Sequence, residues 1–147
     1  MRRNALRALV AMLALSLAAC GGGGGLVKRI NPPVASVQQL RVAPDGSWSL
    51  VVRVNNFSTV PMRFERIDSS LSVAGGASVP VVVTLGFDIP GMSAEVVQAT
   101  VRGNTTIDPS RSFAYRLSGT IATSEKTFDF EKESRLEPVP GIPGEFR

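Results

Sequence analysis

The chain of 147 residues carries 16 basic and 12 acidic residues, one cysteine and no histidine. Without histidine, Ser-His-Asp and Cys-His catalysis are excluded, and a single cysteine removes the remaining usual ligands of zinc and copper. No clustered basic stripe typical of a nucleic-acid binder is visible. We therefore expect a protein that is not an enzyme, with no cofactor, no metal site and no nucleic-acid partner.

Residues 1–19 have the pattern of a secretory signal peptide. Three arginines come first: Arg2, Arg3 and Arg7. A short apolar run from Ala8 to Leu17 follows, and no acidic residue precedes Cys20. The run is shorter than the about 20 apolar residues that span a bilayer. A charged start, a short apolar run and small residues before a cleavage point are typical of exported proteins.

The last four residues of this segment, Leu17-Ala18-Ala19-Cys20, resemble the lipobox of bacterial lipoproteins. In that family a diacylglycerol is attached to the Cys thiol and the chain is cut before it. The resemblance implies lipid attachment at Cys20 and a partner in the membrane itself. The alternative is an ordinary signal peptide that ends at a chance cysteine. For a proteobacterial host with the usual sorting system, Gly21 rather than Asp after Cys20 implies the outer membrane, on its periplasmic face; in a host with a single membrane the question does not arise.

Five consecutive glycines, Gly21–Gly25, follow the cysteine and predict a coil without a preferred conformation. We expect residues 20–32 to form the lipidated cysteine and a Gly-rich tether of roughly 20 Å root-mean-square length. The step Asn31-Pro32-Pro33 disfavours helix and marks the entry to a folded domain at 33–137.

From Pro33 onwards the dominant hydrophobic period is two. In one segment Trp48, Leu50, Val52 and Val54 alternate with mostly polar residues, which predicts a strand with one buried face. Turn sequences such as Pro44-Asp45-Gly46 separate such segments. We predict an all-β, antiparallel immunoglobulin/fibronectin-like β-sandwich of about seven strands: Val34–Val42, Ser47–Asn55, Met62–Ala74, Val79–Asp88, Glu95–Arg102, Ser112–Thr123 and Thr127–Leu136.

Two further expectations concern irregular parts of this sandwich. Phe64 and Ile67 cannot share a face with Leu71 and Val73 in one constant register, which predicts a β-bulge near Glu65-Arg66. The last ten residues, 138–147, are rich in proline and glycine. We expect them to form a flexible C-terminal tail that frays from the domain.

The order of elements resembles the late embryogenesis abundant type 2 family, also called the water stress and hypersensitive response (WHy) domain. The resemblance covers roughly Pro33 to Phe130. It rests on these features in chain order: a Pro-rich opening strand, a strand ending in Asn55-Asn56, the turn Val60-Pro61, a strand closing on Val73-Ala74-Gly75, and the late pattern Tyr115-x-Leu117-x-Gly119. It implies a small β-sandwich without catalytic residues and a role in stress or desiccation tolerance. Bacterial members of the family are often lipoproteins.

Two sets of residues are candidates for chemistry. Asp129, Glu131 and Glu133 share one strand face, and paired carboxylates in a cleft can perform acid–base catalysis. The alternative, which we favour, is a solvated outer face near Lys126 or Arg116. The two remaining candidates, Trp48 and Tyr115, could line a ligand pocket, but their inward positions favour the core.

Three weaker signals remain. The sequences Asn56-Phe57-Ser58 and Asn104-Thr105-Thr106 match the glycosylation sequon, which we interpret as a chance match. Three arginines could contact lipid head groups: Arg53, Arg63 and Arg66.

The leading functional hypothesis is a non-enzymatic, lipid-anchored envelope protein with a stress-protective role. The alternative is an adaptor that docks onto an envelope protein of a transport or assembly complex, because open sheet edges can recruit a partner strand. A third reading is a carrier of small apolar ligands between the two sheets.

Overall fold

A computed structural model describes residue 25 and residues 27–147 of the chain. Cys20, the signal peptide and residues 21–24 and 26 lie outside these described residues. Within the described part the chain forms eight strands and no helix: β1 (Val34–Val42), β2 (Ser47–Asn56), β3 (Met62–Val73), β4 (Val79–Ile89), β5 (Ser93–Arg102), β6 (Phe113–Thr123), β7 (Thr127–Leu136) and β8 (Glu145–Phe146).

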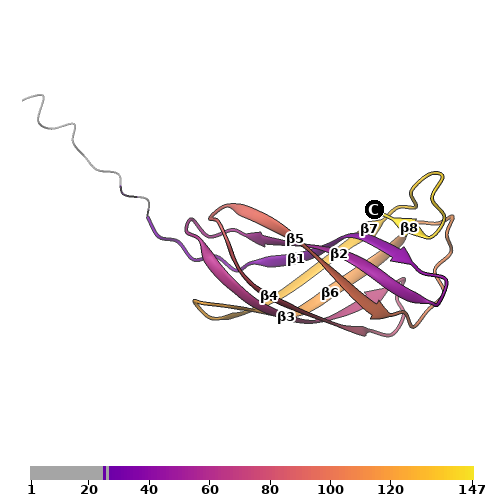
Figure 1. The fold of residues 1–147 in the computed structure, drawn as a ribbon, viewed down its shortest axis with the longest axis horizontal. Helices are drawn as coiled ribbons and strands as arrows, with labels where there is room; N and C mark the ends of the chain where they lie inside the picture. Colours follow the sequence, from indigo (N-terminus) through magenta and orange to yellow (C-terminus); the bar gives the residue numbers. More distant parts are fainter. Residues whose placement is uncertain (1–24, 26) are drawn as a thin grey trace, which may run out of the picture.

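The strands form two antiparallel four-stranded sheets that pack face to face (Figure 1). One sheet has the order β5-β2-β1-β8 and the other β4-β3-β6-β7. The predicted all-β sandwich is therefore confirmed. The seven predicted strands match β1 to β7 within one or two residues at each end.

The core lies between the sheets and follows the period of two. Leu50, Val52 and Val54 of β2 and Leu117 of β6 are buried, whereas Ser49, Arg53 and Arg116 point to solvent. Trp48 and Tyr115 are also buried, so the expectation that both belong to the core is confirmed. Burying such side chains is the main stabilising contribution in a domain without a disulfide.

The predicted bulge in β3 is present. The register of β3 shifts between Phe64 and Arg66 against both of its neighbours, β4 and β6. The extra residue returns Ile67 and Leu71 to the same buried face as Phe64.

The C-terminal segment differs from the expected frayed tail. Glu145 and Phe146 form β8, which pairs with Arg41 and Leu40 of β1. The ring of Phe146 is fully buried and lies edge-on to Phe113, with 4.9 Å between ring centroids. The buried Phe146 therefore attaches the end of this segment to the domain. The prolines and glycines of the segment predict only a loop.

Each end of the sandwich is built from a separate set of loops. The β2–β3, β4–β5 and β6–β7 connections lie at the end where the N-terminal segment enters, and the C-terminal residues lie at the opposite end (Figure 1). No helix among the described residues is long and apolar enough to cross a membrane.

Candidate functional sites at the anchor end and on the open side

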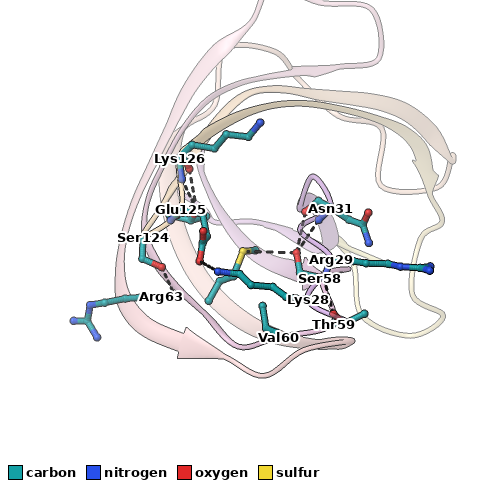
Figure 2. A network of polar contacts seen from close by, with 12 residues as sticks. Lys28, Arg29, Asn31, Ser58, Thr59, Val60, Arg63, Ser124, Glu125 and Lys126 are labelled. Carbon is teal, nitrogen blue, oxygen red and sulfur yellow. Dashed lines mark hydrogen bonds and ion pairs between the residues drawn. The ribbon is translucent and has the colours of Figure 1, made fainter. Parts of the chain in front are cut away.

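The clearest polar site in the described structure is a hydrogen-bond network at the end where the N-terminal segment enters (Figure 2). We call this end the anchor end, because the N-terminal segment that precedes the domain enters here; it comprises residues 27–31, 57–61, 90–92 and 124–126. Its centre is Asn56, the last residue of β2, which is 1% exposed. Its Nδ2 donates hydrogen bonds to three carbonyl oxygens: Val60 (3.0 Å), Ile89 (3.0 Å) and Pro90 (3.2 Å). A single amide therefore joins the β2–β3 loop to the β4–β5 turn.

The network continues through Ser58, which is fully buried. Its backbone N–H donates to Asn56 Oδ1 at 2.9 Å, and its hydroxyl accepts a hydrogen bond of 2.9 Å from the backbone N–H of Asn31. The Ser58 hydroxyl can also donate to the carbonyl of Asn31, 3.2 Å away. Buried polar groups are stable only when they are paired in this way, and this pairing requires the N-terminal segment.

Residues 27–31 are attached to the β2–β3 loop by a series of hydrogen bonds. Arg29 N–H donates to the hydroxyl of Thr59 at 2.9 Å, and that hydroxyl donates to the carbonyl of Val27 at 2.8 Å. The N–H of Thr59 returns a backbone bond of 3.0 Å to the carbonyl of Arg29. Lys28 Nζ lies 3.2 Å from Glu125 Oε1 in the β6–β7 turn. Residues 27–31, which were expected to belong to the tether of 20–32, are therefore bound to the domain.

The anchor end also carries exposed apolar side chains. Met92 is 70% exposed, Val27 66% and Phe57 44%. Met92 has a positive φ of 55°, which is uncommon for a residue with a side chain. This turn is held by a 2.9 Å hydrogen bond from Met92 N–H to the carbonyl of Ser58. The buried network therefore fixes the backbone of the β4–β5 turn, while the side chain of Met92 is exposed to solvent.

Charge is distributed unequally between the two ends. The loops of the anchor end carry three cations and one carboxylate: Lys28, Arg29, Lys126 and Glu125. The loops of the opposite end, 43–46, 74–78, 103–112 and 137–144, carry one cation and three carboxylates: Arg111, Asp45, Asp108 and Glu137. Hydrogen bonds from Ser47 lower the pKa of the Asp45 carboxyl group, and hydrogen bonds from Ser110 lower that of Asp108. Both carboxyl groups are therefore ionised at neutral pH.

The second site is a groove along the side of the sandwich where β1 and β7 lie opposite each other. Its volume is about 460 Å³. Four basic residues line it and no Asp or Glu does: Arg53, Lys132, Arg135 and Arg147. The hydroxyl of the buried Tyr115 reaches across it to the backbone N–H and carbonyl of Val37, both at 3.1 Å. Burial raises the pKa of Tyr115, so its hydroxyl is neutral at physiological pH.

The predicted acidic row does not form a cleft. Asp129, Glu131 and Glu133 are exposed on the outer face of β7. Arg116 of the neighbouring strand forms an ion pair with Glu131 and lies 3.7 Å from Glu133. These contacts raise the pKa of Arg116. The favoured interpretation of a solvated face near Arg116 is confirmed, whereas Lys126 instead lies 4.9 Å from the ring centre of Phe128.

The three arginines considered together do not form one patch. Arg53 lies in β2, whereas Arg63 and Arg66 lie in β3 of the other sheet, next to Asp88 (3.6 Å) and Asp68 (2.7 Å) respectively. Of the two sequons, Asn56 is buried, and the amide of Asn104 donates to the carbonyl of Ala77 at 2.6 Å. Among the described residues no group of acidic side chains is arranged to hold a metal ion.

Sequence reasoning named Tyr115 as a possible pocket residue, but it did not find the contacts that build either site. The Asn56–Ser58 network includes contacts between residues that lie 27 and 34 positions apart, and the Tyr115–Val37 contact joins residues 78 positions apart. No local pattern can reveal such contacts. One signal was available: Asn55-Asn56 is one of the features on which the resemblance rests, and the structure shows that its second residue makes hydrogen bonds to both loops.

No family model matches the sequence, and no curated protein matches it. Among solved structures, a structural genomics target has a TM-score of 0.49 and 14% identity, covering 78% of this chain and 92% of its own. A candidate late embryogenesis abundant protein, known from a solution structure, has a TM-score of 0.44 and 14% identity, covering 93% and 88%. A candidate ApaA protein from Bordetella pertussis has a TM-score of 0.44 and 14% identity, covering 78% and 100%. At these TM-scores and identities, the likenesses assign no family, role or activity to the chain.

Proposed function

We propose that the chain is a non-enzymatic, lipid-anchored envelope protein whose β-sandwich is held against the membrane by its anchor end. The observation that supports this most strongly is the attachment of residues 27–31 to the β2–β3 loop. Only six residues, 21–26, then separate Cys20 from the attached segment. Even fully extended, that length of chain reaches about 25 Å. The lipid on Cys20 would keep the anchor end close to the bilayer.

Charge and apolar exposure at this end favour the same orientation. Anionic lipid attracts basic segments near the surface, and the effect falls off within a Debye length. The loops of the anchor end carry three cations and one carboxylate, whereas those of the opposite end carry one cation and three carboxylates. Phe57 and Met92, together with Val27, are apolar side chains that can enter the headgroup region. The diacylglycerol implied at Cys20 brings two acyl chains, which suffice for stable attachment, so the basic surface would act on the orientation of the domain.

The biological role that we propose for this placement is protection of envelope components under stress, as the resemblance to the late embryogenesis abundant type 2 family implies. The adaptor role is the alternative, and one feature favours it. Val82 of β4 and Val96 of β5, the edge strands on one side of the sandwich, are exposed apolar side chains. A stoichiometric partner recovered with the protein from solubilised membranes would favour the adaptor, and recovery without one the protective role.

The anchor is tested by replacing the single cysteine. Cys20→Ser is expected to abolish labelling of the protein with radioactive palmitate and to leave the uncleaved precursor, because only a thiol forms the thioether. Cells that express the unchanged chain should yield labelled protein in the outer-membrane fraction of a density gradient. Persistent labelling of Cys20→Ser would refute the lipobox, and recovery of the unchanged chain with the inner membrane would refute the proposed location.

A further inference from the structure

We infer that the groove between β1 and β7 is a binding site for an oxyanion of the phosphate type. This inference goes beyond the proposed function and uses only described residues. We call the site the β1–β7 groove; its walls are formed by β1, β2, β6, β7 and the C-terminal residue.

The groove exists because an edge strand of the sandwich carries polar residues on its inward face. In β7, Phe128, Phe130 and Leu136 point into the core, but Lys132 and Ser134 occupy the positions between them. They pair directly with the buried residues Leu117 and Tyr115 of β6. Residues directly opposite in an antiparallel pair share a face. Lys132 and Ser134 therefore face the same side as the core and leave the sandwich open there.

The opposite wall is also open. Strand β1 pairs with β8 only at Leu40 and Arg41. On its other side, the register of β1 with β2 is interrupted between Val37 and Gln39. At Val37 the Tyr115 hydroxyl takes the place of a neighbouring strand by bonding to both backbone groups. A partner strand could not pair with Val37 without displacing this hydroxyl. The groove is therefore suited to a small group rather than to an added strand.

The charged side chains of the residues that line the groove have one sign. Three of its cations have no carboxylate within ion-pair distance in the described part of the chain: Arg53, Lys132 and Arg135. The guanidinium groups of Arg53 and Arg135 are instead oriented by neutral oxygens, Asn55 Oδ1 at 3.3 Å and Ser112 Oγ at 2.8 Å. The fourth, Arg147, lies 3.0 Å from Glu145. Like charges gathered without a counterion repel one another, and a bound oxyanion relieves this repulsion.

Hydrogen-bond donors accompany the cations. Ser36, Gln38 and Ser134 also line the groove. Guanidinium groups bind phosphate through paired N–H donors, and lysine contributes a point charge. The ligand class is thus a phosphate-type oxyanion, either free or carried by a phospholipid head group. The contrasting interpretation is that Lys132 only protects an edge strand from aggregation, as inward-pointing charges do.

The test uses the mature lipidated protein in micelles of an uncharged detergent, followed by amide NMR shifts. Inorganic phosphate is one probe, and phosphatidylglycerol added to the micelles is the other. Sodium chloride at matched ionic strength is the reference. We expect saturable shifts at Val37 and Ser134 with at least one probe, and which probe is bound more tightly identifies the source of the oxyanion.

Two variants localise the binding. The double variant Lys132→Gln, Arg135→Gln is expected to weaken binding at least tenfold. Lys126→Gln, which removes an exposed cation of the anchor end, should leave it within twofold. The inference would be overturned in favour of edge protection by any of three results. These are no shift with either probe, the same shifts with sodium chloride alone, or equal weakening of binding by the double variant and by Lys126→Gln. Unchanged amide spectra away from the groove confirm that each variant is folded.

Discussion

Replacing Asn56 with alanine is expected to lower the free energy of unfolding by about 3 kcal/mol. The change removes the donor shared by the carbonyls of Val60, Ile89 and Pro90 and the acceptor of the Ser58 N–H. Each buried polar group left without a partner costs about 1–3 kcal/mol, and water that enters the space of the lost amide recovers part of this. Urea unfolding followed by the fluorescence of Trp48, the single tryptophan, measures the loss.

Two matched changes show whether the amide itself is responsible. Asn56→Asp keeps the size and the acceptor but places an oxygen against three carbonyl oxygens, so its loss should equal or exceed that of alanine. Asn55→Ala removes the neighbouring, half-buried amide, whose bond is to the exposed Arg53, and should cost less than about 1 kcal/mol. Similar losses at positions 55 and 56 would show that the network does not stabilise the anchor end.

The second large effect is expected at Gly119, the final residue of the pattern Tyr115-x-Leu117-x-Gly119. A Cβ atom added there would lie 2.2 Å from the carbonyl oxygen of Asp68 and 2.6 Å from the Cα of Ser69, both in the neighbouring strand β3. Because these are backbone atoms, the strands must separate locally. Gly119→Ala should therefore lower the free energy of unfolding by about 2–3 kcal/mol, the usual effect of overpacking a core.

Ser118→Ala is the control for Gly119→Ala, because it changes the adjacent, half-buried residue without adding an atom next to β3. We expect it to alter stability by less than about 0.5 kcal/mol in the same urea experiment. If Gly119→Ala were equally mild, the close approach of β6 to β3 would not restrict this position.

The regular part of the fold could be predicted from the sequence because each strand carries its own alternation. The positions of Leu50 and Leu117 and even the bulge before Ile67 follow from counting apolar residues in steps of two. The attachment of Phe146 could not be predicted, because a single aromatic residue that follows several prolines and glycines is not part of any alternating pattern. Its burial depends on Phe113, which is 33 residues away in the chain.

The sites could be predicted less well because they depend on contacts between loops. Thr59 is an ordinary loop residue in the sequence, and only the structure places its hydroxyl between Val27 and Arg29. Lys132 and Ser134 were visible as polar residues in a strand, but the sequence does not show that β7 is an edge strand facing β1. The membrane anchor is the opposite case, since the hypothesis for Cys20 rests on sequence alone.

The central claim, that the anchor end rests on the membrane, is tested most directly by methionine oxidation. After cleavage before Cys20 the protein retains two methionines, the buried Met62 and the exposed Met92. The measurement adds a third by Ile142→Met at the opposite end, where Ile142 is 41% exposed against 70% for Met92. The lipidated variant is reconstituted into vesicles containing phosphatidylglycerol and treated with hypochlorous acid, and mass spectrometry follows each site and the lipid on Cys20.

We expect Met92 to be oxidised several-fold more slowly than the methionine introduced at position 142, although Met92 is the more exposed of the two in the domain itself. Met62 serves as the protected reference. Oxidation of Met92 at least as fast as at position 142, on protein that carries the lipid, would contradict contact between the anchor end and the membrane while leaving the anchor itself intact.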